Sequence, residues 1–478
     1  MPKVGIALCL ALALFACSDD EPDTSVVVNG ETLIGQEVES GRVHAFLGVP
    51  FAEPPVGELR WQAPRPLTTK LAHREVTSFA PACMQSMRIL DWYRWMAVSF
   101  GGEADYYDDL EVSEDCLYLN VWTPTLDDTA NLPVMVWIHG GSNRSGWSYE
   151  PNYHGHKLAQ KGVVVVSVAY RQGLFGFISH DELPTDQAQA NFGLWDLIAS
   201  LGWIQNHIGA FGGDRNRVML FGESAGGQNI LSLMMIEQAR DLFHGASLQS
   251  TGSFGIEPVP TLEDERERMR DFAERLGDRT MSLEALRELP ADELLAVYEE
   301  QFSDYYHQAA IDTQLIHEPH WQRMQKGLFP DIPLIIGTNA DETSDADQTN
   351  ATFLCPSQGV ARFAAAANQD VWMYYLTRAR EGKFGQEIGA YHGAEYPYQF
   401  GTHDDYMPTT EIDVELQKTM QAYWLTFAYF GIPKSTQTPL WPAFDAPDYF
   451  VQELGDTVKT IEPPEQETCE AFLKNPHH

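Results

Sequence analysis

The sequence predicts an α/β protein with a central, mostly parallel β-sheet and helices on both faces. Residues 134–139 and 163–169 are short apolar runs rich in β-branched side chains, which is typical of strands buried on both faces of a parallel sheet. From Val26 onwards such runs alternate with helical patterns, and this alternation favours strand–helix–strand units. No internal repeat or low-complexity block interrupts the pattern, so we expect a single domain over residues 26–478.

The other expected elements follow in order along the chain. Apolar residues recur at helical spacing over residues 193–208, and the glycines within residues 211–214 are typical of a helix C-terminus. Residues 261–325 are more helical and more charged, and we expect them to form an insertion over the sheet. Further strands are expected at residues 217–221, 334–337 and 371–376.

The composition excludes several classes of function. The chain has 31 lysine and arginine residues against 68 aspartate and glutamate residues, a formal net charge of −37 at pH 7. Such a surface repels phosphate backbones and anionic headgroups, so we expect no nucleic-acid partner and no membrane contact through the protein surface. A hydrophobic content of 44% excludes an acidic disordered chain. No apolar run is long enough to cross a bilayer, which takes about 20 residues.

The N-terminus is typical of an export signal rather than of a folded element. A charged start and a short apolar stretch end in small residues, and Leu14-Phe15-Ala16-Cys17 resembles the bacterial lipobox, in which the cysteine is lipidated. We therefore expect residues 1–17 to be a signal peptide with a lipobox and residues 18–25 an acidic tether. The protein would be exported and anchored in the bacterial cell envelope. Ordinary secretion after Ala13 or Ala16 is the alternative.

The most specific local motif surrounds Ser224. Residues 222–227 read Gly-Glu-Ser-Ala-Gly-Gly, directly after one expected strand and before an apolar helical pattern. A sharp strand-to-helix turn would hold the hydroxyl exposed, and only small residues at 222 and 226 let the chain pass without a clash. The helix N-terminus would aim backbone N–H groups at a developing oxyanion. A tight structural turn without chemistry is the alternative interpretation.

A second glycine-rich loop, His139-Gly140-Gly141-Ser142, follows the strand expected at 134–139. Its backbone can approach a ligand closely, so the N–H groups of Gly141 and Ser142 are expected to join that of Ala225 as an oxyanion hole. We expect the imidazole of His139 to orient the loop rather than to take part in chemistry.

These residues resemble the type-B carboxylesterase and cholinesterase family of α/β-hydrolases. The resemblance covers nearly the whole mature chain, and its motifs lie at residues 46–57, 114–120, 170–171, 175–177, 191–194, 211–214, 389–395 and 441–444. It implies an α/β-hydrolase fold and a serine carboxylic ester hydrolase that needs no cofactor and no metal. Histidine pairs at 154/156 and 317/320 lack further ligands at diagnostic spacing.

The resemblance also assigns the remaining catalytic residues. Glu342, after the strand expected at 334–337, is implied as the acid, and His392 as the base that accepts the proton of Ser224. This chain order, serine, acid, histidine, is the one typical of the fold. Asp341 is the alternative acid.

Other residues carry supporting roles by the same resemblance. Glu223 lies beside the nucleophile, and Ser250 is implied to support the acid. With Cys9 in the signal and Cys17 lipidated, four cysteines remain, and the sequence alone permits three pairings. The family pattern implies two disulfides and two ion pairs, namely Cys83–Cys116, Cys355–Cys469, Arg60–Glu114 and Arg171–Asp196.

Two departures from the family pattern bear on specificity. Ser142 stands where a third glycine is common, and its Cβ narrows the acyl side or limits a positive φ. Only 50 positions separate Glu342 from His392, fewer than in most relatives. We therefore expect a reduced helical cap and a more open site that favours bulky esters.

The sequence leaves two further hypotheses open. The chain could be a catalytically silent, cholinesterase-like binding or adhesion protein, or the same triad could act on amide, carbamate or lactone bonds. The acidic loop between Cys83 and Cys116 is rich in tryptophan and tyrosine. Its aromatics either line the site mouth or pack beneath a solvated loop. The sequence does not decide the oligomeric state.

Overall fold

A computed structural model describes residues 24–252, 259–302 and 305–474. The expected signal peptide, Cys17 and the tether up to residue 23 lie outside the described residues. Among the described helices, none is both long and apolar enough to cross a membrane.

The described residues form an 11-stranded sheet with the order β16-β15-β14-β13-β12-β11-β9-β10-β8-β4-β3. Neighbouring strands from β10 through β15 run parallel, whereas β8, β4, β3 and β16 pair antiparallel at the two edges. The strands are β3 Gln36–Val38, β4 Val43–Pro50, β8 Tyr118–Thr123, β9 Leu132–Ile138, β10 Val164–Val168, β11 Gly213–Glu223, β12 Gly245–Gln249, β13 Leu334–Asn339, β14 Val371–Leu376, β15 Val451–Leu454 and β16 Lys459–Ile461.

Two smaller sheets lie beside the large one. They consist of β1 Ser25–Val28, β2 Glu31–Ile34 and β5 His73–Glu75, and of β6 Ala82–Cys83 and β7 Val112–Ser113. The α-helices are α1 Arg88–Ser99, α2 His156–Ala159, α3 Gly173–Gly176, α4 Phe192–His207, α5 Ala225–Met235, α6 Leu262–Arg275, α7 Leu283–Glu288, α8 Ala291–Phe302, α9 His320–Gln325, α10 Ala346–Thr349, α11 Cys355–Ala366, α12 Lys383–Ile388, α13 Tyr396–Phe400, α14 Glu411–Phe430 and α15 Gln466–Lys474.

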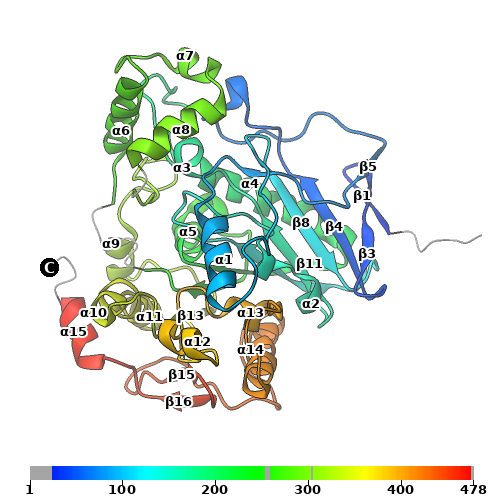
Figure 1. Cartoon of the computed structure of the whole chain (residues 1–478), viewed down its shortest axis with the longest axis vertical. Helices are drawn as coiled ribbons and strands as arrows, with labels where there is room; N and C mark the ends of the chain where they lie inside the picture. Colours follow the sequence, from blue (N-terminus) through cyan, green and yellow to red (C-terminus); the bar gives the residue numbers. More distant parts are fainter. Residues whose placement is uncertain (1–23, 253–258, 303–304, 475–478) are drawn as a thin grey trace, which may run out of the picture.

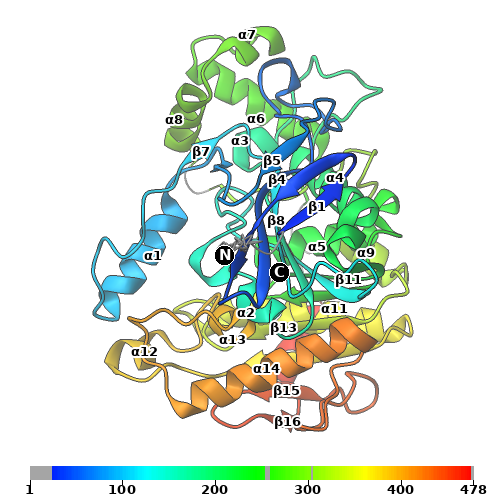
Figure 2. The same cartoon turned by 90° about the vertical axis from the view of Figure 1, so that its right-hand side faces the viewer.

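Helices cover both faces of the large sheet (Figures 1 and 2). In β9 the alternation of side chains sends Val134 and Val136 to one face and Met135 and Trp137 to the other. The first face packs against α4, α5 and α11, and the second against α2, α13 and α14. Because both faces are buried, β9 and β10 are almost entirely apolar, and the predicted α/β architecture with a central, mostly parallel sheet and helices on both faces is confirmed.

The expected elements are present with small shifts of their ends. The strand expected at 217–221 is longer than predicted, Gly213–Glu223, because Gly213 already pairs with Leu132 before an irregularity in the register. The helical insertion consists of α6, α7, α8 and α9. Figure 1 shows α6–α8 together at one end of the molecule, where they share an apolar cluster with α3.

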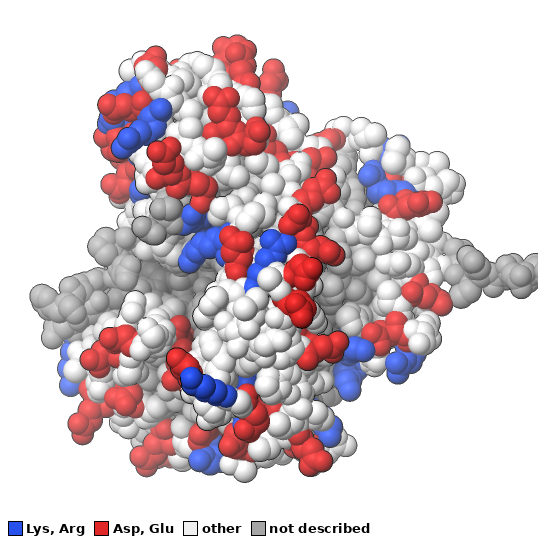
Figure 3. Space-filling model, in the orientation of Figure 1, with Lys and Arg blue, Asp and Glu red and all other residues white. Residues whose placement is uncertain are grey.

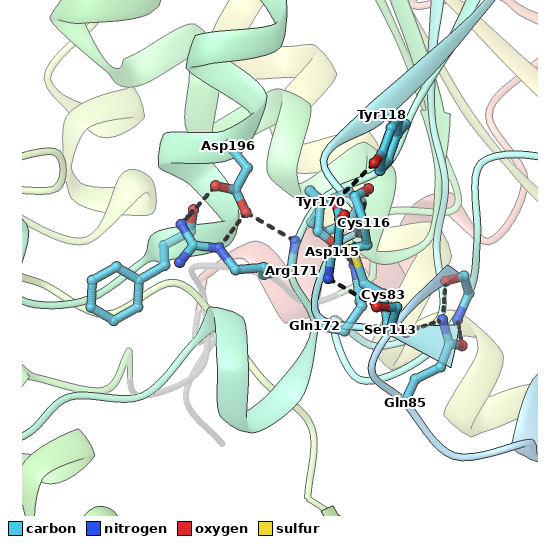
Figure 4. Close-up of a disulfide and its surroundings, with 12 residues drawn as sticks. Cys83, Gln85, Ser113, Asp115, Cys116, Tyr118, Tyr170, Arg171, Gln172 and Asp196 are labelled. Carbon is cyan, nitrogen blue, oxygen red and sulfur yellow. Dashed lines mark hydrogen bonds and ion pairs between the residues drawn. A yellow bond between two sulfur atoms is a disulfide. The ribbon is translucent and has the colours of Figure 1, made fainter. Parts of the chain in front are cut away.

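The cysteines pair as the resemblance implied, Cys83 with Cys116 and Cys355 with Cys469. Figure 4 shows the first disulfide near the ion pair of Arg171 with Asp196. In that pair Nη2 lies 2.7 Å from Oδ1 and Nε lies 2.8 Å from Oδ2, with both side chains buried.

The second expected ion pair also forms. The Arg60 guanidinium donates to both carboxylate oxygens of Glu114, at 2.6 and 2.7 Å. These two-point contacts fix loops at the edge of the sheet, next to the Cys83–Cys116 bridge.

Candidate active site

Ser224 occupies a strained turn between β11 and α5. Its φ of 54° and ψ of −127° are uncommon for a residue with a side chain. A Cβ at position 222 would lie 2.5 Å from the Ile138 carbonyl oxygen, and one at 226 only 2.0 Å from it. Both glycines are therefore required for β11 and α5 to pass close to the end of β9. The turn leaves Ser224 half-buried at the N-terminus of α5.

The loop after β9 lies directly against this turn. Gly141 has φ 105° and Ser142 has φ 63°, so the serine accepts the left-handed conformation that its position demands. A Cβ on Gly140 would approach the Ser224 Cβ to 3.0 Å, which shows how closely the loop packs. Within the described chain, the N–H groups of Gly141 and Ser142 have no hydrogen-bond acceptor. The Ala225 N–H belongs to the first turn of α5 and also lacks an acceptor within the helix.

Asn143 fixes the loop from behind. Its side-chain oxygen accepts a hydrogen bond from Asn229 Nδ2 at 2.7 Å, and its amide donates to the His307 carbonyl at 3.1 Å. His139 is buried and stacked on Tyr170, and burial lowers the pKa of its imidazole to about 4. A neutral, buried imidazole of this kind agrees with a structural role for His139.

Glu342 lies beyond the end of β13 and is buried in hydrogen bonds. One carboxylate oxygen accepts from the Asn339 N–H at 2.7 Å and from the hydroxyls of Ser250 and Thr338, each at 2.5 Å. The other oxygen lies 2.5 Å from His392 Nδ1. Burial alone would raise the pKa of Glu342, but His392 and the hydrogen bonds outweigh it and lower the pKa.

Asp341 takes a different position from Glu342. Its carboxylate accepts a hydrogen bond from the Ala390 N–H at 2.8 Å, and among the described residues it forms no hydrogen bond or ion pair with the imidazole of His392. The geometry therefore favours Glu342 over Asp341 as the partner of His392.

The second ring nitrogen of His392 faces Glu223. The distance from Nε2 to Glu223 Oε1 is 3.0 Å, and the hydroxyl of Tyr396 donates to the other oxygen of Glu223. Burial opposes protonation of His392, but the carboxylates of Glu223 and Glu342 outweigh burial and raise its pKa to about 10. Burial in turn raises the pKa of Glu223 well above its usual range. Among the described residues, the Ser224 side chain has no hydrogen-bond partner.

A pocket of 190 Å³ opens above these groups. It brings together five of the residues singled out from the sequence, namely Gly141, Ser142, Glu223, Ser224 and His392. Ala225, Ser250 and Glu342 are buried and do not line this pocket.

Sequence reasoning missed several pocket residues, among them Glu150, Tyr153 and Tyr396. Glu150 accepts a hydrogen bond from Tyr93 at 2.7 Å, and burial raises its pKa to about 7. Only Tyr396 carried a usable signal, because it directly follows the motif around His392.

The aromatic loop between Cys83 and Cys116 combines both expected roles. Trp92 and Tyr93 of α1 line the pocket, whereas Tyr107 is buried beneath the loop and hydrogen-bonds Tyr406. Trp95 is 51% exposed and lies outside the pocket. In the described part of the chain, no group of three or more His, Cys, Asp or Glu residues is arranged to hold a metal ion.

Comparisons with known proteins agree with this architecture. The carboxylesterase family profile matches residues 22–352 and 346–472. The chain is 32% identical to para-nitrobenzyl esterase of Bacillus subtilis, with 84% of this chain and 89% of that protein covered. It is 31% identical to fumonisin B1 esterase of Sphingopyxis macrogoltabida, with 85% and 82% covered.

A solved structure of a PNB esterase superposes with a TM-score of 0.82 at 30% identity, over 94% of this chain and 99% of that one. A family profile that spans most of the chain and a relative of nearly equal length identify the class of protein. The chain belongs to the carboxylesterase family of α/β-hydrolases and is a carboxylic ester hydrolase.

Proposed function

We propose that Ser224, His392 and Glu342 form the catalytic triad of this esterase. The observation that carries the proposal is the shared pocket. Ser224 stands on a strained turn and lines the same cavity as His392, whose Nδ1 lies 2.5 Å from Glu342. A carboxylate at Nδ1 holds the proton there and leaves Nε2 as the base.

In this mechanism Ser224 Oγ attacks the ester carbonyl while His392 Nε2 accepts the hydroxyl proton. The N–H groups of Gly141, Ser142 and Ala225 donate to the oxyanion of the tetrahedral intermediate. His392 then gives the proton to the leaving alcohol, and an acyl-serine remains. Water, deprotonated by the same imidazole, releases the acid and restores Ser224.

The imidazole has to turn toward Ser224 for this step. In the structure Nε2 faces Glu223 at 3.0 Å, yet Ser224 and Glu223 are neighbours that line one pocket. Catalytic hydrogen bonds are often long before substrate binds and tighten in the complex. We propose that an ester seated on the Gly141–Ser142 N–H groups draws the ring from the carboxylate to the hydroxyl.

Bulky esters are the substrates that we propose, on the grounds of a short cap segment and of aromatic surface beside the pocket. The 50-residue separation of Glu342 from His392 leaves little chain for a cap. Trp92 and Tyr93 offer apolar surface for the alcohol or acyl group.

We also propose that the enzyme is exported and lipid-anchored through Cys17. Two disulfides fit an oxidising compartment, and the lipobox-like residues 14–17 precede the described chain. A Cys17→Ser variant should still be exported but leave the membrane fraction. Equal membrane association of both proteins would contradict the anchor.

Two serines line the pocket, and this allows a matched test of the nucleophile. A fluorophosphonate should label Ser224, with the adduct located by peptide mass spectrometry. Ser224→Ala should lose turnover of para-nitrophenyl acetate by a factor of about 10⁶. Ser142→Ala, which keeps the backbone N–H, should retain label and turnover.

Each remaining outcome of the test is decisive. Full activity of Ser224→Ala, or label on Ser142, would overturn the assignment. A folded native protein that hydrolyses no ester of a panel, yet binds ligands, would favour a silent binding protein instead. Faster turnover of amides, carbamates or lactones than of matched esters would change the type of bond assigned to the enzyme, but the proposed triad would stand.

A further inference from the structure

A second, larger pocket lies apart from Ser224. Its volume is 320 Å³, within the range of small-molecule sites, and it shares no lining residue with the pocket at Ser224. Four segments form it: the β1–β2 hairpin, the end of β4, the loop at residues 64–74 and one face of α4. Figure 2 shows β1, β4 and α4 on the same side of the molecule.

One wall of this second pocket is apolar. Leu33, Phe51 and Trp203 are each at least 91% buried and contribute to the lining. On α4, Ala199 and Gly202 line it one turn apart, and a Cβ on Gly202 would meet no atom within 4 Å. The small residues at positions 199 and 202 therefore leave space beside the larger α4 side chains that also line the pocket.

The charged residues of the lining are mostly cationic, in a chain that is strongly acidic overall. They are Arg65, Lys70 and Arg74 against one carboxylate, Glu31, which pairs with Arg74 at 2.8 Å. The lining thus carries a net charge of +2, while the whole chain carries −37.

The two remaining cations are held by neutral groups. Arg65 donates to the Gln62 side-chain oxygen at 2.7 Å, and Lys70 donates to the carbonyl and side-chain oxygens of Asn29 at 3.0 Å. Within the described chain neither forms an ion pair. Burial lowers the pKa of His207, so this neighbour adds little charge at neutral pH.

We propose that this second pocket binds an aliphatic carboxylate, with its chain along Phe51 and Trp203 and its carboxylate at Arg65 and Lys70. The apolar wall favours an aliphatic body, and the two solvent-exposed cations, which form no ion pair within the described chain, favour an anionic end. The proposal is independent of the triad, because its readout is binding rather than turnover.

The test measures decanoate binding to the whole purified protein by isothermal titration calorimetry, with acetate and decanol as comparisons. Arg65→Glu/Lys70→Glu should weaken decanoate binding at the second pocket at least about tenfold. Gly202→Leu should abolish that binding by filling the cavity. Lys161→Glu, which changes an exposed cation outside the pocket, should bind as the native protein does.

Retained esterase activity and an unchanged circular dichroism spectrum verify that each variant is folded. Equal decanoate binding by Gly202→Leu and the native protein would overturn the site. Equal binding of decanol would show that the cations play no part, and equal binding of acetate would show that the apolar wall plays none. Either result would overturn the ligand class.

Discussion

At the scale of single residues, the imidazole of His392 lies between two carboxylates. Nδ1 contacts Glu342 at 2.5 Å and Nε2 contacts Glu223 at 3.0 Å. This arrangement holds the protonated ring, with its pKa raised to about 10. In the proposed mechanism His392 has to be neutral to accept a proton, so the contact with Glu223, which favours imidazolium, would oppose that step in the free enzyme. We therefore propose that Glu223 is a positioning residue, whose charge controls the pH at which His392 becomes neutral.

Exchanging Glu223 for glutamine tests this role. The variant removes a carboxyl group that, when ionised, favours imidazolium, so the pKa of His392 falls toward its ordinary value. Activity that needs neutral His392 rises with pH through that pKa. The acid limb of the pH profile of kcat/KM should therefore move to lower pH, by about one to two units for one contacting carboxylate.

Glu395→Gln provides the control for this measurement. Glu395 is another buried carboxylate near the ring, but it contacts Asn339 and affects the pKa of His392 less than Glu223 does. Its substitution should move the acid limb less. A profile unchanged in Glu223→Gln, or shifted more by Glu395→Gln, would contradict the role given to Glu223.

Ser142 provides a second test at this scale. Its φ of 63° is open to glycine and tolerated by serine, but a β-branched residue avoids it. Ser142→Gly should keep kcat for a small ester, whereas Ser142→Val should turn the N–H away and lower kcat by roughly 10². Steady-state kinetics on para-nitrophenyl acetate checks both. Equal kcat in the two variants would contradict the proposal that the Ser142 N–H belongs to the oxyanion hole.

At the scale of elements, α1 forms one wall of the candidate active site. It lies in the loop closed by Cys83 and Cys116, and its residues Trp92 and Tyr93 reach the pocket. Tyr93 also donates to buried Glu150. The disulfide therefore closes the loop that holds Trp92 and Tyr93 against the pocket.

Removing this disulfide should affect substrate binding as well as stability. Cys83→Ala/Cys116→Ala opens a loop whose ends are 33 residues apart, which costs about 3 to 4 kcal/mol of unfolding free energy. Because α1 loses its tether, KM for a bulky ester should rise more than kcat falls. Denaturant unfolding and steady-state kinetics measure the two effects.

The second disulfide serves as the matched control. Cys355 and Cys469 join α11 to α15, and neither helix lines the pocket. Cys355→Ala/Cys469→Ala should lower stability by a comparable amount and leave KM unchanged under folding conditions. A rise of KM in both variants alike would mean that general loosening, not the position of α1, explains the effect.

Elements whose geometry is local could be predicted from the sequence. The glycines at 222 and 226 predict the turn at Ser224, because a Cβ at either position would clash within that same turn. The contact of His392 with Glu223 and the burial of Glu150 could not be predicted in this way. They depend on how α13 and the loop after β9 pack over β11, and no residue spacing encodes that distance.

At the scale of the whole molecule, the acidity is a property of the surface. Figure 3 shows acidic side chains spread over the visible face, including the region of α6–α8, with fewer basic ones among them. Many of the basic residues form ion pairs with carboxylates, as Arg270 and Arg279 of the insertion do. A net charge of −37 thus produces a broad negative field around the molecule.

This field should favour cationic esters in a salt-dependent way. The Debye length falls from about 30 Å at 0.01 M salt to about 3 Å at 1 M. The ratio of kcat/KM for a thiocholine ester to that for its uncharged carbon isostere should therefore fall at least about threefold over this range. Asp105→Asn/Asp108→Asn, in the loop that carries α1, should lower the ratio at low salt. Asp445→Asn/Asp448→Asn removes the same charge elsewhere and should have a smaller effect. If the ratio stays constant with salt, the acidic surface affects solubility but not the choice of substrate. If the two double variants lower the ratio equally, the preference for cationic esters comes from the field of the whole molecule rather than from the loop.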